Sequence, residues 1–184
     1  MKQVLLISGS LAALKSTLAK RLSTDLNVVC MNKDDMKEVL GDTIGFNNRE
    51  ENLKLSKATF HMMVKLMLDL LKVHDLVILE SNFKAYEIKY LNEIVSLHHI
   101  RQSVVFLTGE VDVLYDRYVK RHPERHHVHT STGLMSFENF KLSMAPFDLE
   151  LYGNRSFIYD TTVMNDLKYQ ELLEKVKELL NDQS

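Results

Sequence analysis

The sequence predicts an α/β protein built on a parallel sheet of five strands, with helices on both faces. Short apolar segments alternate five times with amphipathic helical patterns along the chain. The apolar segments show no polar–apolar alternation, which is typical of strands that are buried on both faces. We expect strands over 3–8, 27–31, 76–80, 104–107 and 156–160.

The segments between these strands have helical periodicity. Gly41 is placed to end a short helix that starts at Asp34 or Asp35. Pro123 disfavours helical geometry in the preceding residue, so the helix before it should end near His122. We expect 122–135 to be polar and irregular, and the other helices to cover 15–23, 50–73, 85–98, 111–121, 136–147 and 166–180.

Composition limits the class of protein. The 184 residues fit one domain over 1–184, and 45% apolar with 26% charged residues is an ordinary globular composition. A net charge of −2 gives no general basic field for nucleic acid, and the single Cys30 excludes a disulfide scaffold. The apolar run 4–7 is too short for a signal peptide, and Lys65 and Asp69 interrupt the longest apolar stretch. We therefore expect a cytoplasmic protein that binds neither nucleic acid nor a membrane.

The first predicted strand-to-helix turn is a near match to a phosphate-binding loop, whose pattern is G-x-x-x-x-G-K-[ST]. Leu14 stands at the second glycine position, and the other three fixed positions match. A nucleophile elbow and a dinucleotide-binding turn both lack their required glycines here. A plain tight turn is the simpler alternative, but the predicted strand and helix around the segment and its Lys15-Ser16-Thr17 favour the phosphate-binding loop. The segment reads Gly9-Ser10-Leu11-Ala12-Ala13-Leu14-Lys15-Ser16-Thr17.

The residue types in this loop suit phosphate and metal chemistry. Backbone N–H groups at a helix start form an anion cradle. The Lys15 ammonium would reach the β- and γ-phosphates of a nucleotide, and the Ser16 hydroxyl would bind Mg²⁺. Leu14 would cost about 1–2 kcal/mol in a left-handed conformation, and a clash of its side chain with phosphate would cost more. Ala12 and Ala13 favour a helical conformation of the loop.

Polar side chains farther along the chain complete the candidate site. Glu80 ends an apolar run, where a carboxylate needs a partner such as Mg²⁺ through water or a nearby lysine. Asn82 is a weaker candidate for the substrate or metal shell. Guanidinium groups bind phosphate well, which makes Arg117, Arg121 and Arg125 candidates, although spaced arginines are also common on solvated helix faces.

Four histidines near the arginines raise the hypothesis of a zinc site. Their spacing matches no standard zinc pattern and no cysteine lies nearby, so a polar lid is the better interpretation. We expect Cys30 to be a buried thiol without an activating partner. The histidines are His122, His126, His127 and His129.

The ordered set of motifs resembles small P-loop kinases of the AAA-like ATP-binding group, which are related to zeta-toxin-like and chloramphenicol phosphotransferase-like enzymes. The resemblance implies a nucleoside-monophosphate-kinase-like fold with a short lid at about 122–135. It also implies that Asp34 contacts the acceptor hydroxyl and can act as its base, although an aspartate at this place also suits a helix cap. Leu14 departs from the family's pattern. The resemblance covers nearly the whole chain and rests on 7–19, 32–38, 79–83, 115–125 and 159–162.

These residues and the resemblance predict an ATP-dependent phosphotransferase that acts on a small hydroxylated molecule. Lys15 would bind the β- and γ-phosphates, and Ser16 and Glu80 would hold Mg²⁺. Arg121 and Arg125 would neutralise the transferring group.

Two other functions remain open at this point. Leu14 favours a kinase-like binding protein that has lost nucleotide affinity, and a nucleotide hydrolase is a third reading. For the phosphotransferase, we expect the acceptor pocket to be formed by 41–60 and the lid.

Overall fold

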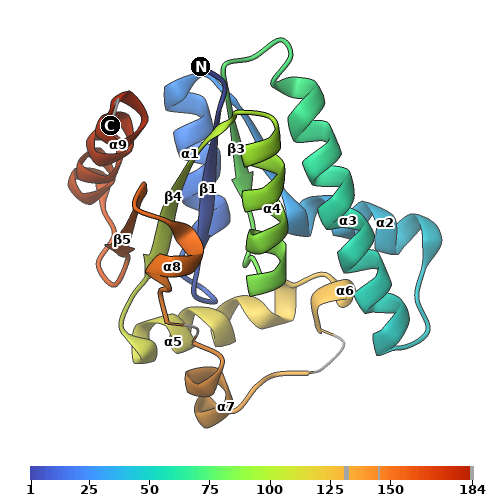
Figure 1. Cartoon of the computed structure of the whole chain (residues 1–184). Coiled ribbons are helices and arrows are strands. Elements are labelled where there is room, and N and C mark those ends of the chain that lie inside the picture. The colour runs from blue at the N-terminus through green and yellow to red at the C-terminus, as the bar shows by residue number, and fades with distance from the viewer. Residues whose placement is uncertain (131–132, 145, 183–184) are drawn as a thin grey trace.

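The computed structural model describes residues 1–130, 133–144 and 146–182. Within this part of the chain the strands form one all-parallel sheet in the order β2-β3-β1-β4-β5, which confirms the predicted sheet (Figure 1). The strands are β1 (Gln3–Gly9), β2 (Val29–Asn32), β3 (Leu76–Glu80), β4 (Arg101–Thr108) and β5 (Ser156–Asp160).

The central position of β1 determines where a ligand can bind. Ile7 of β1 is in register with Glu80 of β3 on one side and with Val105 of β4 on the other. The loop that leaves β1 therefore emerges between the ends of β3 and β4, and Glu80 lies beside it. This is the edge of an open parallel sheet at which ligands bind.

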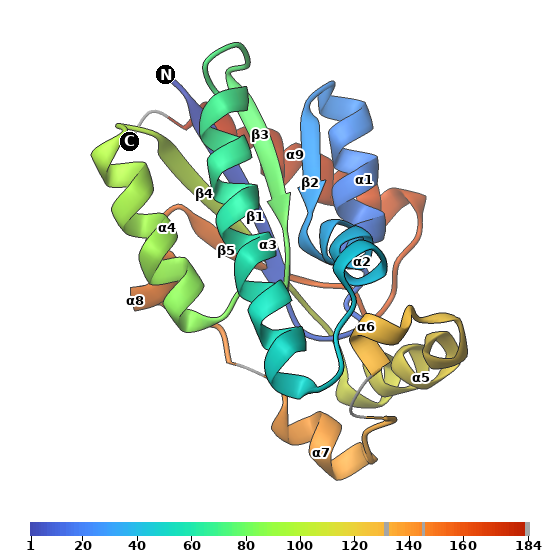
Figure 2. The ribbon, with the colours of Figure 1, turned by 90° about the vertical axis from the view of Figure 1, so that its right-hand side faces the viewer.

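Helices cover both faces of the sheet, as predicted (Figure 2). Leu5 and Ile7 of β1 belong to the core under α1 and α9, whereas Val4 and Leu6 belong to the core under α3 and α4. Adjacent residues of one strand thus serve opposite cores, which explains the unbroken apolar run in the sequence. The covering helices are α1 (Lys15–Leu26), α3 (Arg49–Leu70), α4 (Ala85–Leu97) and α9 (Asp166–Asn181).

The remaining helices lie toward the carboxyl ends of the strands, several of them at the bottom of Figure 1. None of the helices in the described residues is both long enough and apolar enough to pass through a membrane. These helices are α2 (Lys33–Ile44), α5 (Val111–Arg121), the 3-10 turn η1 (His122–Glu124), α6 (His127–Thr130), α7 (Phe137–Leu142) and α8 (Leu149–Tyr152).

Three predicted boundaries are wrong. Helix α2 continues through Gly41 and ends at Gly45, whose φ of 75° suits a helix end. Gly41 is instead a close-packing position, because an added Cβ would lie 3.1 Å from the Val128 side chain. The segment expected to be irregular contains η1 and α6, with 131–132 outside the described residues, and the helix expected over 136–147 is only the six-residue α7.

A buried ion pair fixes the junction between β2 and α2. The Lys33 Nζ lies 2.5 Å from Glu87 Oε1, and the two side chains are only 6% and 0% exposed. Glu87 also accepts a hydrogen bond from the backbone N–H of Lys84, so it caps α4 as well. Because Lys33 immediately precedes Asp34, this pair ties the candidate base to the rigid start of α4.

Replacing one member of this pair should be strongly destabilising. Lys33→Met keeps the side-chain length but leaves the Glu87 carboxylate buried without its cation, and we expect the free energy of unfolding to fall by about 3–5 kcal/mol. Urea denaturation measures this loss. The matched control is Lys54→Met, which breaks an exposed pair with Glu50 and should change stability little. Equal stabilities of Lys33→Met and the wild type would contradict the role of the pair.

Candidate functional site

The loop after β1 begins at a glycine that no other residue can replace. Gly9 has φ of 131°, and an added Cβ would lie 2.0 Å from the backbone oxygen of Leu107. The next residue, Ser10, donates its backbone N–H to that same oxygen at 2.9 Å. The chain therefore leaves β1 pressed against β4, and its direction is set by backbone contact.

Leu14 adopts the left-handed conformation that a glycine would favour. Its φ and ψ are 58° and 22°, and Ala12 has φ of 60°. The loop is not wound into helix, because α1 begins only at Lys15. The Leu14 side chain is partly buried and packs against the core under α1, as does that of Leu11. The energetic cost of the left-handed conformation at Leu14 is therefore already present in the folded loop, and the Leu14 side chain packs against the protein.

Lys15 points back along the loop. Its Nζ donates to the carbonyl oxygens of Ser10 at 2.7 Å and Gly9 at 3.2 Å. Burial lowers the pKa of Lys15 to about 8, and the neighbouring Arg121 acts in the same direction, whereas Glu80 opposes the shift. The ammonium group is therefore charged at neutral pH, and these two backbone oxygens are its hydrogen-bond partners among the described residues.

Ser16 and Glu80 form a pair at the end of β3. The Ser16 hydroxyl donates to Glu80 Oε2 at 3.1 Å, and Glu80 is 4% exposed. Burial raises the pKa of Glu80 to about 7, although the charge of Lys15 opposes the rise. The lysine partner considered for Glu80 is thus replaced by a hydroxyl. A serine hydroxyl beside a carboxylate is a donor set that suits Mg²⁺.

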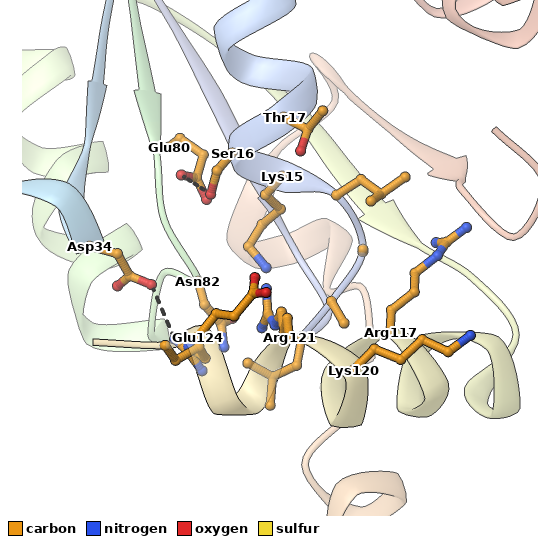
Figure 3. Close-up of a pocket in the computed structure, with 15 residues that line it drawn as sticks. Lys15, Ser16, Thr17, Asp34, Glu80, Asn82, Arg117, Lys120, Arg121 and Glu124 are labelled. Carbon is orange, nitrogen blue, oxygen red and sulfur yellow. Dashed lines mark hydrogen bonds and ion pairs between the residues drawn. The ribbon is translucent and has the colours of Figure 1, made fainter. Parts of the chain in front are cut away.

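A cavity of about 450 Å³ brings most of the predicted residues together (Figure 3). Gly9 and Ser10 shape the loop behind it and do not line it. Lys120 and Glu124 also line the cavity, and the sequence analysis did not single them out. The lining consists of loop residues 11–17, Asp34, Glu80 and Asn82, together with Arg117, Lys120, Arg121, Glu124 and Arg125 from α5 and the turn after it.

Several buried donors around this cavity lack a partner within the described residues. They are Ser10 Oγ, Arg117 Nη1 and Arg121 Nε. The other terminal nitrogen of Arg117 donates to the backbone oxygens of Thr161 and Thr162 after β5, at 2.9 and 3.0 Å. The Arg117 guanidinium is therefore held by the backbone after β5, and its Nη1 remains without an acceptor among the described residues. Buried donors without acceptors are costly, and an anionic ligand would satisfy them.

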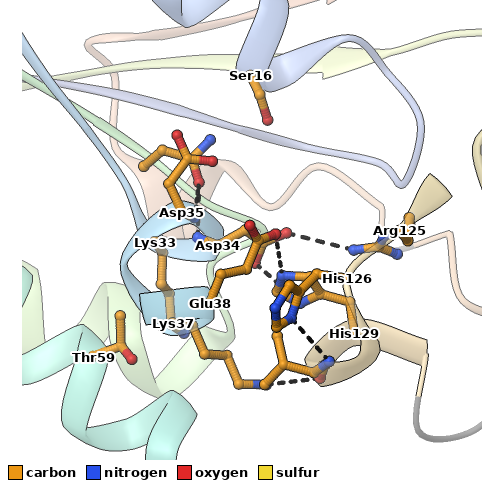
Figure 4. Close-up of polar contacts among 12 residues, drawn as sticks. Ser16, Lys33, Asp34, Asp35, Lys37, Glu38, Thr59, Arg125, His126 and His129 are labelled. Carbon is orange, nitrogen blue, oxygen red and sulfur yellow. Dashed lines mark hydrogen bonds and ion pairs between the residues drawn. The ribbon is translucent and has the colours of Figure 1, made fainter. Parts of the chain in front are cut away.

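Asp34 does not cap α2. The cap is Asn32, whose Oδ1 accepts from the backbone N–H groups of Asp34 at 2.7 Å and Asp35 at 3.1 Å. The Asp34 carboxylate instead forms an ion pair with Arg125 at 3.5 Å (Figure 4). His129 Nδ1 lies 3.9 Å from the same carboxyl group. The side chain of Asp34 thus faces the segment after α5 and is available to a ligand.

A second cavity of about 360 Å³ adjoins the first one at Asp34. Glu38 and His129 line it, and His129 Nε2 lies 3.0 Å from Glu38 Oε1. Burial lowers the pKa of His129, so this imidazole is neutral at pH 7. The sequence pointed to His129 only as one of four histidines in a zinc hypothesis, and to Glu38 only as part of the segment 32–38. A signal for Glu38 was present, since it follows Asp34 by four positions on one helix face.

The expectation that 41–60 contributes to the acceptor pocket stays a prediction, and this segment lies apart from both cavities. Residues 44–47 with Glu51, Lys54 and Leu55 line a separate groove, and none of 41–60 lines either cavity described above. The second cavity is lined by residues of α2, of α5 and of the segment after α5. These elements come together because α6 packs directly on α2 (Figure 2).

The imidazole rings of His127 and His129 both contact that of His126, whereas His122 contacts Tyr118. His126 and His127 lie near Asp42, with possible ligand atoms within 4.8 Å of one another. However, His126 Nδ1 accepts from the Val128 N–H, which places the ring proton on Nε2, the atom 3.0 Å from Asp42 Oδ1. His126 is therefore a hydrogen-bond donor to Asp42, which supports the polar-lid interpretation. Burial raises the pKa of the Cys30 thiol to about 12, as expected for an inert cysteine.

No protein-family model matches this chain. The search of curated proteins likewise gives no significant match.

Solved structures match over nearly the whole chain. A candidate kinase from Chloroflexus aurantiacus has a TM-score of 0.79 at 21% identity, covering 100% of this chain and 98% of its own. Shikimate kinase from Bacteroides thetaiotaomicron has a TM-score of 0.64 at 17% identity, with 98% and 99% covered. The APS kinase CysC of Mycobacterium tuberculosis, solved with AMPPNP and APS, has a TM-score of 0.62 at 14% identity, with 98% of each chain covered. The chain therefore has the fold of P-loop kinases.

Proposed function

We propose that this protein is an ATP-dependent phosphotransferase that acts on a small hydroxylated molecule. The observation that carries the proposal is the first cavity, where one loop, two strand ends and α5 bring a lysine, a hydroxyl–carboxylate pair and unpartnered arginine nitrogens to one place. The structural neighbours support it, because one is a shikimate kinase and another was solved with AMPPNP.

The nucleotide would bind with its phosphates in the loop 9–17. Backbone N–H groups at the start of α1 would surround the phosphates. Lys15 would exchange the carbonyl oxygens of Gly9 and Ser10 for phosphate oxygens. Ser16 and Glu80 would hold Mg²⁺, which neutralises phosphate charge when bound. Arg117 would bind near the far end of the nucleotide through its free nitrogen.

The acceptor would occupy the second cavity, next to Asp34. Its hydroxyl oxygen forms a bond to the γ-phosphorus while the bond from that phosphorus to the β–γ bridging oxygen breaks, which releases ADP. The hydroxyl proton passes to the Asp34 carboxylate. Arg121 and Arg125 would offset the charge on the transferring phosphoryl group, and Arg125 already lies 3.5 Å from Asp34. We also propose that 1–184 acts as one domain, with 122–135 as its lid.

Removing Lys15 should abolish nucleotide binding. Lys15→Ala deletes the loop cation that would bind the β- and γ-phosphates, so we expect no measurable heat when Mg·AMPPNP is titrated into the variant, in contrast to the wild type. Lys20→Ala is the matched control, because Lys20 lies on the same helix, points to solvent and pairs with Asp35. Unchanged binding by Lys15→Ala would refute the assignment of the loop.

Leu14→Gly distinguishes this function from a binding protein that has lost nucleotide affinity. The wild-type loop already has the left-handed conformation, so its strain is present with and without ligand and cancels in the binding free energy. We expect the Kd of Leu14→Gly for Mg·AMPPNP to stay within about threefold of the wild type, which is less than about 0.7 kcal/mol. Binding that appears only in Leu14→Gly would instead support the binding protein.

Magnesium-dependent affinity should fall as the pH drops below 7. The pKa of Glu80 is raised to about 7, so its carboxylate is protonated below that value and can no longer hold a metal ion. We expect the Kd for Mg·AMPPNP to rise about tenfold per pH unit below pH 7. The same titration in EDTA reports the nucleotide's own protonation and should be shallower. Identical slopes with and without magnesium would contradict the role of Glu80.

Phosphate transfer is tested with labelled ATP and a set of small polyols and sugars. We expect acceptor-dependent transfer by the wild type, and a loss of about 100-fold or more in kcat for Asp34→Asn, which keeps the shape of Asp34 but cannot take a proton. Free phosphate released equally with and without acceptor would show a nucleotide hydrolase instead.

A further inference from the structure

The second cavity has an unusual chemical lining. It contains four carboxylates, two arginines, two histidines and Ser16, so the described lining is polar and carries no aliphatic side chain. An acceptor with a large apolar surface would find no aliphatic group to pack against here. The lining instead suits a small molecule with polar groups on all sides.

The two arginines are not free to neutralise the acceptor. Arg121 and Arg125 also line the first cavity, and in the proposed function they bind the transferring phosphoryl group. Lys37 is another cation near this cavity, and its Nζ lies 3.5 Å from the Val128 backbone oxygen. Lys20 is paired with Asp35 at 3.0 Å. Neither lysine lines the cavity, and Lys20 offsets the charge of Asp35, one of its four carboxylates.

Three carboxylates then remain for the acceptor. Asp34 is the proposed base. With nucleotide bound and both arginines at the phosphoryl group, Glu38 and Glu124 would have no cationic partner among the residues that line the cavity. Glu38 has His129 as its hydrogen-bond partner, and that imidazole is neutral at pH 7 because burial lowers its pKa. Glu124 also lines this cavity, from η1. An anionic acceptor such as a sugar acid would be repelled here.

We infer that the acceptor is a polyhydroxylated amine, such as an amino-polyol or amino sugar, whose ammonium group binds at the carboxylates of Glu38 and Glu124. One hydroxyl of this molecule reaches Asp34 and receives the phosphoryl group. This inference rests on the proposed function for the place of the phosphoryl group, but the charge preference of the cavity can be measured separately.

Three ligands with one carbon skeleton test the inference. Glucamine carries an ammonium group, sorbitol is neutral and gluconate carries a carboxylate. Calorimetry at pH 7.5 on the protein saturated with Mg·AMPPNP should give a Kd for glucamine about tenfold lower than for sorbitol, with gluconate weaker than both. Comparable affinity for gluconate, or no binding by any of the three ligands to the nucleotide complex, would overturn the inference.

Variants then locate the charge preference. Glu38→Gln and Glu124→Gln should each reduce the ratio of the sorbitol Kd to the glucamine Kd, whereas Asp112→Asn, which removes an exposed carboxylate of α5 outside the cavity, should preserve it. An unchanged ratio in both glutamine variants would contradict the assignment.

The same titrations separate the two proposals. If Mg·AMPPNP does not bind, the proposed function fails, and the three ligands are titrated into the free protein. A preference for glucamine there would keep the charge assignment of the cavity, and its absence would end it.

Discussion

The close approach of Gly9 to the backbone of Leu107 is the constraint on which the candidate site depends. There is no space for a Cβ at Gly9, and the Ser10 N–H is bonded to the Leu107 oxygen. The loop must therefore turn over the ends of β1 and β3, where Lys15 and Ser16 meet Glu80. Backbone packing in the middle of the sheet thus sets the position of the loop on which the proposed function depends.

Leu14 shows how a motif can depart from its pattern and keep its geometry. A glycine is favoured in the left-handed region because it lacks a Cβ, yet a leucine can occupy that region at a cost of about 1–2 kcal/mol. This cost lowers the stability of the folded protein. It does not lower the affinity for a ligand whose binding leaves the conformation of Leu14 unchanged. The apolar side chain also packs against the core under α1 and contributes to stability there. The departure in sequence therefore gives no direct measure of nucleotide affinity.

The sequence predicted the elements whose signals are local and missed those that depend on distant contacts. Apolar runs and helical periodicity located the five strands and the helices around them. Gly41 looked like a helix stop, but it is a packing position against Val128, 87 residues away in the chain, and Gly45 ends the helix. Likewise Asn32 takes the capping role considered for Asp34. The pairing of His129 with Glu38 requires the fold itself, since the two residues are 91 positions apart.

The central claim is that the backbone of the loop 10–17 surrounds a phosphate chain. Amide resonances of ¹⁵N-labelled protein, followed while Mg·AMPPNP is added, test this claim most directly, because N–H groups that donate to phosphate shift strongly. We expect the largest shifts at residues 11–17, with saturation at one equivalent of bound nucleotide. Resonances of this loop that do not move, while those of another surface do, would contradict it.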